Sequence, residues 1–192
     1  MTRLTYGVGY NSKRDHQTTI DGKPTIAYRT WHSMMSRCYD QKTLKRSPTY
    51  IGCNVADDWH DYQDFADWFY SHNYSSMGYQ LDKDLILPNN KIYSSSTCAF
   101  VPHELNSLLL VAKSLRGEFP QGVYMDKRRD KLMAIIRING ERRFLGIFDC
   151  PNEAHQAYKL AKERHVKNKA LEWANRIEWN VFVALMNWTL DS

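Results

Sequence analysis

The chain has 192 residues, enough for one domain or two small ones, and a formal net charge of +5. Aromatic residues make up 13% of it, a composition that belongs to folded proteins and excludes a disordered one. No run of 18 apolar residues occurs, and the N-terminus lacks the apolar core of an export signal, so we expect neither a membrane span nor secretion.

The four cysteines are scattered, at Cys38, Cys53, Cys98 and Cys150. They contain no Cys-x-x-Cys pair, so a zinc ribbon is unsupported and reduced thiols are expected. Two or three of them could still meet in space.

Two amphipathic helices are predicted in the first third of the chain. Residues 27–39 place Tyr28, Trp31, Met35 and Cys38 on one stripe. After a polar, basic loop at 44–48, residues 57–70 form a second helix with acidic residues in its first turn, where the helix dipole favours them. Its apolar face consists of Trp59, Tyr62, Phe65, Ala66 and Phe69.

The opposite face of this second helix carries four aspartates, Asp58, Asp61, Asp64 and Asp67. Such a cluster suggests a metal site, but clustered carboxylates without a cation repel one another. Three-residue spacing opposite an aromatic stripe is more typical of a solvated helix face, which is the interpretation we favour.

Residues 80–110 follow a strand, turn, strand, helix order. Strands are predicted at 80–86 and 91–93 around the turn Pro88-Asn89-Asn90, and a helix begins at Pro102. Asp82 then ends the first strand, and Asn106 lies one turn into the helix, where it could approach that strand. A carboxylate and an amide oxygen converging there could hold one divalent metal ion, Mg²⁺ or a similar cation.

The segment 116–169 is predicted to be a small sheet followed by a helix. Residues 122–125, 132–138 and 142–148 form three strands, the middle one with the two-residue period of a sheet, and Asn139-Gly140 suits the tight turn of a hairpin. Pro151 suits the first turn of a helix. Ala154, Ala157 and Ala161 recur at helical spacing and would let that helix lie close to the sheet.

The positive charge of the chain is concentrated in this segment. Residues 116–169 carry 13 Lys and Arg against 7 Asp and Glu, whereas residues 1–115 carry 12 against 11. The arginines on or beside the predicted strands are Arg128, Arg129, Arg137, Arg142 and Arg143. Arginines on a sheet face can contact phosphates and read guanine edges in a major groove, so we predict double-stranded DNA as the partner. The alternative is a solvated sheet face.

The fold class is therefore α+β, in three parts. Residues 1–115 form a mixed region with the strand–strand–helix order, residues 116–169 the basic sheet-and-helix domain, and residues 170–192 a C-terminal helix with Trp173, Ile177, Val181, Leu185 and Trp188 in helical register.

The basic domain contains GVY at 122–124, AIIR at 134–137, NG at 139–140, FLGIF at 144–148, EA at 153–154, AY at 157–158 and AK at 161–162. Together these resemble the Apetala-two/ethylene-response-factor domain, over most of its length. The resemblance implies a three-stranded antiparallel sheet on one helix, with the sheet in the DNA major groove. It assigns the DNA contacts to Arg128, Arg129, Arg137, Arg142 and Arg143. In phage and bacterial chains such a module usually accompanies a nuclease or an integrase.

The segment from Asp82 to Asn106 resembles the ββα-metal, or HNH, nuclease motif. Asp82 and Asn106 match its metal-ligand positions, while Lys83 stands in place of the histidine general base and Thr97 in place of a structural asparagine. A base must be neutral near pH 7 to accept a proton from water, and the carboxylates beside Lys83 work against that. His103, one helical turn before Asn106, is the alternative base.

Nearly the whole chain resembles phage-encoded HNH or homing endonucleases that end in an Apetala-two-like module. The segments that carry this resemblance include WHSMMSRCY at 31–39, PTYIGC at 48–53 and LDKD at 81–84. It implies a metal-dependent hydrolase of duplex DNA, acting in the cytoplasm of a host cell. A DNA-binding protein on a degenerate nuclease scaffold is the second hypothesis, and an RNA-binding or purely interaction role is the third.

Overall fold

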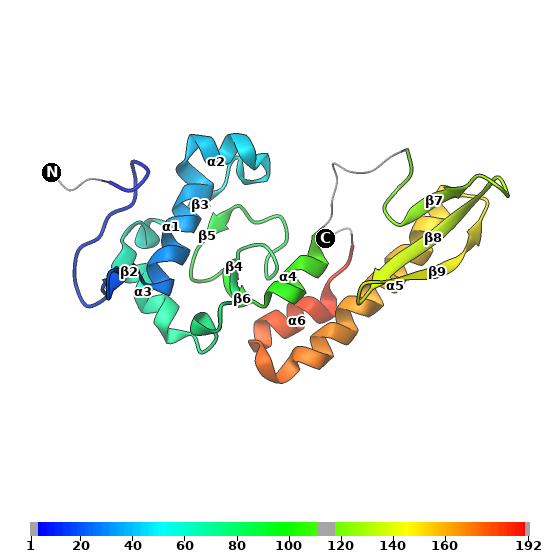
Figure 1. Ribbon diagram of the computed structural model, residues 1–192. Helices are drawn as coiled ribbons and strands as arrows, with labels where there is room; N and C mark the ends of the chain where they lie inside the picture. The colour runs from blue at the N-terminus through cyan, green and yellow to red at the C-terminus, as the bar shows by residue number, and fades with distance from the viewer. Residues whose placement is uncertain (1–3, 111–117, 191–192) are drawn as a thin grey trace. The chain divides into compact units, whose positions relative to one another are not determined.

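The computed structural model describes residues 4–110 and 118–190. The chain is a mixture of helices and short strands and divides into two units, residues 1–103 and 104–192, which are described separately (Figure 1). The expected boundary at 115/116 lies outside the described residues. None of the described helices combines the length and the apolar run that crossing a lipid bilayer requires.

The first unit contains three α-helices, six short strands and three 3-10 turns within its described residues. Their bounds are β1 Thr19–Ile20, β2 Lys23–Pro24, α1 Ile26–Tyr39, α2 Gln41–Arg46, η1 Pro48–Tyr50, β3 Asn54–Val55, η2 Asp57–His60, α3 Tyr62–Ser71, η3 Ser75–Met77, β4 Gln80–Asp82, β5 Ile92–Tyr93 and β6 Ala99–Val101. The helix predicted at 27–39 is confirmed as α1, whose N-cap is Thr25.

The helix predicted at 57–70 is interrupted at Asp61. The backbone of Asp61 is extended, and its carboxylate accepts hydrogen bonds from the backbone N–H groups of Gln63 and Ser12. Asp61 therefore caps α3 and separates it from the 3-10 turn η2. The prediction of one continuous helix over 57–70 is wrong. The sequence pattern does not reveal that Asp61 acts as a cap, because its second partner, the N–H group of Ser12, comes from the N-terminal segment.

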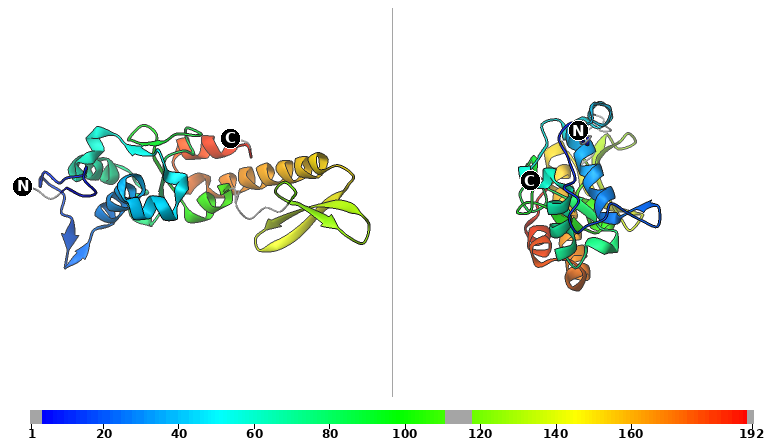
Figure 2. Two further views of the ribbon diagram at one scale, coloured as in Figure 1. Left: turned by 90° about the horizontal axis from the view of Figure 1, so that it is seen from above. Right: turned by 90° about the vertical axis from the view of Figure 1, so that its left-hand side faces the viewer.

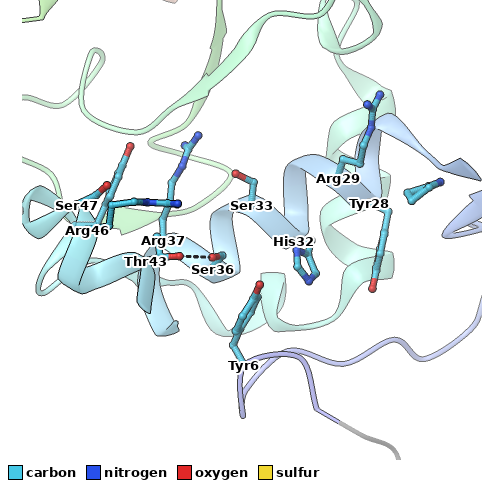
Figure 3. A pocket seen from close by; sticks show the side chains of 12 residues that line it. Tyr6, Tyr28, Arg29, His32, Ser33, Ser36, Arg37, Thr43, Arg46 and Ser47 are labelled. Carbon is cyan, nitrogen blue, oxygen red and sulfur yellow. Dashed lines mark hydrogen bonds between the residues drawn. The ribbon is translucent and has the colours of Figure 1, made fainter. Parts of the chain in front are cut away.

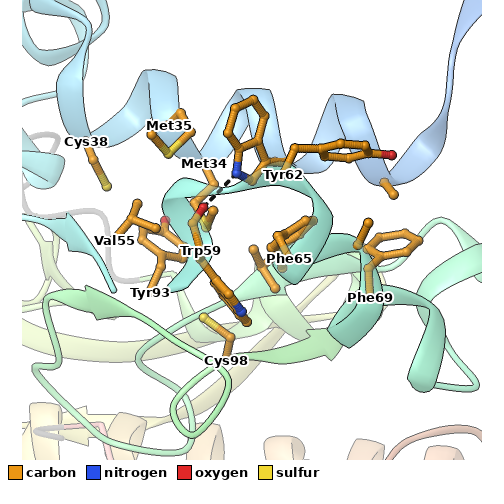
Figure 4. Packing of buried hydrophobic residues seen from close by; sticks show 14 of the residues in the cluster. Met34, Met35, Cys38, Val55, Trp59, Tyr62, Phe65, Phe69, Tyr93 and Cys98 are labelled. Atoms are coloured by element: carbon orange, nitrogen blue, oxygen red, sulfur yellow. Dashed lines mark hydrogen bonds between the residues drawn. The ribbon is translucent and has the colours of Figure 1, made fainter. Parts of the chain in front are cut away.

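The core of the first unit is aromatic (Figure 4). Trp31 of α1, Trp59 of η2 and Phe65 of α3 are almost fully buried in one cluster. The indole Nε1 of Trp31 donates a hydrogen bond to the carbonyl of Trp59 at 2.8 Å, so this buried polar atom is satisfied. The cluster joins α1, η2 and α3 to the strands β3, β4, β5 and β6.

The strands of the first unit pair differently from the expected hairpin. β4 pairs with β6 in an antiparallel sheet, and β5 pairs with β3 in a parallel one. The predicted turn at Pro88-Asn89-Asn90 thus separates strands of two different sheets. Pairing between segments far apart in the sequence outweighs the local turn signal here.

The second unit begins within α4 and contains the basic domain. Its elements are α4 His103–Leu109, which starts one residue before the unit, β7 Val123–Asp126, β8 Lys131–Ile138, β9 Glu141–Phe148, α5 Pro151–Trp173, η4 Ala174–Arg176 and α6 Trp179–Asn187. The strands form one antiparallel sheet in the order β7-β8-β9. Asn139 and Gly140 both have positive φ, 52° and 84°, which confirms the tight hairpin turn.

Helix α5 lies along one face of this sheet (Figure 2). Val123, Leu132 and Ala134 of the sheet pack against Ala154 of the helix, and Ile136 packs against Tyr158. We call this the inner face. The close approach depends on small residues, as the alanine spacing predicted.

The expected helix at 170–192 differs from what is observed. No helix-breaking residue occurs between Lys167 and Trp173, so α5 continues through position 170, and only α6 is a separate helix. Lys169 and Glu104 form an ion pair at 2.9 Å, which ties α4 to the end of α5 within the second unit.

Gly122 makes the approach of α5 to the sheet possible. It has a φ of 82°, and a Cβ atom there would lie 2.1 Å from Cδ2 of Tyr158, a ring that is itself held by Ile136 and Leu190. Gly140 has a similar φ, but a Cβ there meets open space.

We predict that Gly122→Ala lowers the free energy of unfolding of the second unit by about 2–4 kcal/mol, since backbone strain and overpacking add. Gly140→Ala, the matched control, should cost only the strain, about 1–2 kcal/mol. Urea unfolding followed by circular dichroism measures both. Equal losses in the two variants would show that the contact with Tyr158 does not matter.

Candidate nucleic-acid interface and expected metal centre

The outer face of the three-stranded sheet is the face opposite α5, and within the described residues of the second unit no helix lies on it. Strand alternation and the observed register place one set of side chains there. They are Tyr124 of β7, Met133, Ile135 and Arg137 of β8, and Arg142, Phe144 and Ile147 of β9.

Two arginines lie directly opposite each other on this outer face. Arg137 of β8 pairs in register with Arg142 of β9, beside the hairpin turn, and both are exposed. Like charges in facing positions on neighbouring strands destabilise a sheet, whereas opposite charges stabilise it. The juxtaposition of the two charges therefore does not stabilise the sheet, and it concentrates positive charge at one end of the face.

Aromatic side chains accompany these arginines. The guanidinium carbon of Arg142 lies 5.8 Å from the centre of the Tyr124 ring, and Phe144 is 59% exposed. An exposed phenylalanine on a strand has no role in the core. Neither Tyr124 nor Phe144 was predicted to contact DNA, although the two-residue period that places Arg142 on this face places Phe144 there as well.

The other arginines predicted to contact DNA lie elsewhere. Arg143 pairs with the buried Ile136 and is therefore directed toward the inner side, where its charge acts on His165 of α5. Arg128 and Arg129 lie in the turn between β7 and β8, and Arg129 forms an ion pair with Asp126 at 3.3 Å. Of the five arginines, only Arg137 and Arg142 share the outer face.

The expected metal centre lies around the end of β4. The order β4–β6–α4 supplies two antiparallel strands followed directly by a helix, as the sequence analysis expected, although the second strand is residues 99–101 and not 91–93. Asp82, Lys83 and His103 belong to the first unit and Asn106 to the second. The pairing of Asp82 with Asn106 stays a prediction.

Asp82 organises the loop that follows β4. Its Oδ1 accepts hydrogen bonds from the backbone N–H groups of Asp84 at 3.0 Å and Leu85 at 2.7 Å, so the side chain closes a local turn. Burial, and then the nearby carboxylate of Asp84, raise the pKa of Asp82 above its ordinary value. Burial and the Asp84 carboxylate thus disfavour the ionised form that a metal ligand requires, whereas the two backbone N–H groups favour it.

Lys83 is held in place by its surroundings. Only 6% of the residue is exposed, and its Nζ donates to Oδ2 of Asp84 at 2.9 Å and to the carbonyl of Asn90 at 3.1 Å. Burial lowers the pKa of Lys83, but the hydrogen bond and charge of Asp84, together with the nearby Cys53 and Asp82, outweigh burial, and the net change is upward. The geometry therefore favours a charged structural lysine and does not fit the neutral state that a general base requires.

The remaining positions of the expected nuclease motif have different surroundings. Thr97 donates from its hydroxyl to the carbonyl of Ile92 at 2.8 Å and so holds the loop before β6. His103 is exposed at the first position of α4, and Asn106 is half-buried in the same helix. Among the described residues, no group of three or more His, Cys, Asp or Glu side chains is arranged to hold a metal ion.

The aspartate stripe of α3 and the cysteines also have structural explanations. Arg14 forms ion pairs with Asp61, Asp64 and Asp67, and His16 contacts Asp67 at 2.7 Å, so basic residues cover this helix face. Cys38, Cys53 and Cys98 are buried as free thiols in the aromatic core, and burial raises the pKa of Cys38 and of Cys98 to about 12. Those two are neutral core residues at neutral pH.

Comparison of the chain with protein-family models, with curated proteins and with solved structures found no match.

We predict that Asp82→Asn becomes more stable relative to wild type as the pH rises. An acid whose pKa is raised by folding contributes stability below its unfolded pKa of about 3.9, and this contribution is lost as the pH rises through the folded value. The amide is neutral throughout and its oxygen can still accept both N–H groups. Urea unfolding of both proteins between pH 4 and 7 measures the difference. Asp82→Ala, which removes the acceptor, should instead cost about 1–3 kcal/mol.

If Asp82→Asn instead becomes less stable relative to wild type as the pH rises, Asp82 is preferentially ionised in the folded protein. That result would favour a ligand role over a structural one.

Proposed function

We propose that this protein binds double-stranded DNA through the outer face of the β7–β9 sheet, with Arg137 and Arg142 as its main contacts. The observation that carries the proposal is the facing pair of arginines on a sheet surface that α5 leaves uncovered. A three-stranded sheet on one helix is also the architecture that the resemblance to the Apetala-two/ethylene-response-factor domain leads one to expect.

An anionic partner explains why two cations face each other. Their repulsion disfavours the free sheet slightly, whereas phosphate groups or guanine edges placed between them turn it into attraction. The major groove of DNA admits a β-ribbon, and arginine is the commonest side chain to bind guanine there. The exposed Phe144 and the Tyr124 ring add apolar surface that can contact thymine methyl groups or sugars.

We predict that Arg142→Ala weakens binding to duplex DNA by about 1–3 kcal/mol, since a charged donor to the DNA is lost. The slope of the logarithm of the binding constant against the logarithm of the salt concentration should become shallower by about 0.9, the contribution of one phosphate contact. Arg137→Ala should behave in the same way. Fluorescence anisotropy with a labelled duplex, at several KCl concentrations, measures both quantities.

Arg143→Ala is the matched control, because this neighbouring arginine has the same charge but faces the inner side of the sheet. It should change affinity much less than Arg142→Ala. Equal effects at 142 and 143 would mean that only net charge matters, and unchanged affinity in both Arg137→Ala and Arg142→Ala would exclude the outer face as the docking surface.

The second candidate is a homing-type DNA endonuclease of the HNH class, encoded by a phage, with Asp82 and Asn106 holding Mg²⁺. The order β4–β6–α4, with an aspartate at the end of β4, favours it. The charged, hydrogen-bonded state of Lys83 and the turn formed by Asp82 favour a DNA-binding protein that no longer cleaves. His103, which is exposed, is the remaining candidate base.

We expect no cleavage above background when supercoiled plasmid is incubated with the protein and Mg²⁺ or Mn²⁺, because the best-placed base is a charged lysine. Asp82→Asn, which keeps the turn, should give the same result as wild type. Nicking by wild type that disappears in Asp82→Asn and in His103→Ala would establish the endonuclease instead.

A further inference from the structure

A basic groove in the first unit is lined by none of the residues proposed to bind DNA through the sheet or to hold a metal ion. It runs along α1 and α2, has a volume of about 740 Å³ and is lined by twelve residues (Figure 3). Arg29, His32, Arg37 and Arg46 supply nitrogen donors, and seven further side chains carry hydroxyl groups, of which those of Ser36 and Thr43 are hydrogen-bonded to each other. No aspartate or glutamate lines it. Guanidinium and hydroxyl donors without carboxylates are the lining that binds phosphate groups.

Two of the three arginines are available to a ligand. Arg29 and Arg46 are exposed, and among the described residues neither has a carboxylate partner. Arg14, also in the first unit, is by contrast surrounded by aspartates of α3. Arg37 is half-buried and its guanidinium lies 5.5 Å from the centre of the Tyr50 ring, so it is held in a fixed position.

The spacing of these donors suits a nucleic-acid strand, with several phosphates, better than a single phosphate group. Arg29, Ser33 and Arg37 lie four residues apart on one face of α1, which spans roughly 12 Å at about 1.5 Å per residue. Successive phosphates of one DNA strand are about 3.4 Å apart along the duplex axis and farther apart along the strand itself, so this length spans more than one phosphate.

The groove continues toward β4. A second hollow shares Arg29, Ser33 and Arg37 with the first and extends to residues 78–81, immediately before Asp82. A DNA strand that follows α1 in this direction therefore reaches the segment around Asp82, which the resemblance to the HNH motif assigns to catalysis.

We propose that this groove binds the phosphodiester backbone of DNA, with Arg29 and Arg46 contacting phosphates and Arg37 fixed between them. The identity of the ligand rests on the proposed function, since it would be the same DNA that the sheet binds. The residues that carry the two proposals are different, so each can fail without the other.

The test uses the full chain and a labelled 30-base-pair duplex, with anisotropy measured between 50 and 300 mM KCl. The variants are Arg29→Gln, Arg46→Gln and the double variant. Lys45→Gln is the matched control, because this exposed cation neighbours Arg46 on α2 but does not line the groove. Circular dichroism establishes that the variants fold, as expected for substitutions of exposed side chains.

We expect the double variant to bind about tenfold more weakly and to flatten the salt slope by roughly 1.8, since each lost phosphate contact removes about 0.9. Lys45→Gln should leave both nearly unchanged. A double variant that binds DNA as wild type does, with the same slope, overturns the groove proposal even where Arg142→Ala weakens binding.

The reverse pattern separates the two proposals. If the groove variants lose affinity for DNA while Arg137→Ala and Arg142→Ala keep it, the groove is the DNA-binding site and the proposal for the sheet is overturned. A polyglutamate peptide of matched charge supplies the last comparison. If it binds as tightly as DNA, and with the same dependence on Arg29 and Arg46, the groove takes polyanions in general and its assignment to nucleic acid is wrong.

Discussion

The close packing of α5 against the inner face of the sheet is the constraint on which the second unit depends. A single helix can cover only one side of three strands, and Ala134, Ala154 and Gly122 let it come near enough to bury that side. The same packing fixes which side chains face outward. Because Leu132, Ala134 and Ile136 point toward the helix, Met133, Ile135 and Arg137 must point away from it. The outer face, with its facing arginines, is a direct consequence of the core.

In the first unit a different interaction shapes the region expected to be catalytic. Lys83 and Asn90 bind each other's backbone carbonyls, and Lys83 also pairs with Asp84, so the loop between β4 and β5 is closed by a buried cation. Removing one partner of such a pair leaves an uncompensated charge, which makes the arrangement difficult to change. Lys83, which the resemblance to the HNH motif places where a histidine is expected, thus has a structural explanation in its local contacts.

Two sets of basic residues have contrasting surroundings. Arg14, Lys83 and Lys169 are paired with carboxylates and serve the fold. Arg29, Arg46, Arg137 and Arg142 are exposed, and within the described residues none of them pairs with a carboxylate. Charges of the second group favour the folded state little, because exposed cations are well solvated in either state. Their grouping, two in a groove of one unit and two on a sheet face of the other, is what points to an anionic ligand.

The sequence by itself determined the local elements of the basic domain. Alternating residues, the Asn139-Gly140 turn and Pro151 were sufficient for β8, β9 and the start of α5, because neighbouring residues alone set these features. It also selected Arg137 and Arg142, but it selected Arg143 with them. The pairing register of β8 and β9 is needed to show that Arg142 lies opposite Arg137 and that Arg143 lies opposite the buried Ile136. The tertiary structure alone decided the partners of β4 and β5, the cap at Asp61 and the pairing of Lys83, because each depends on residues distant in the chain or on burial. The groove of α1 and α2 likewise exists only once the two helices meet, since no short stretch of sequence contains it.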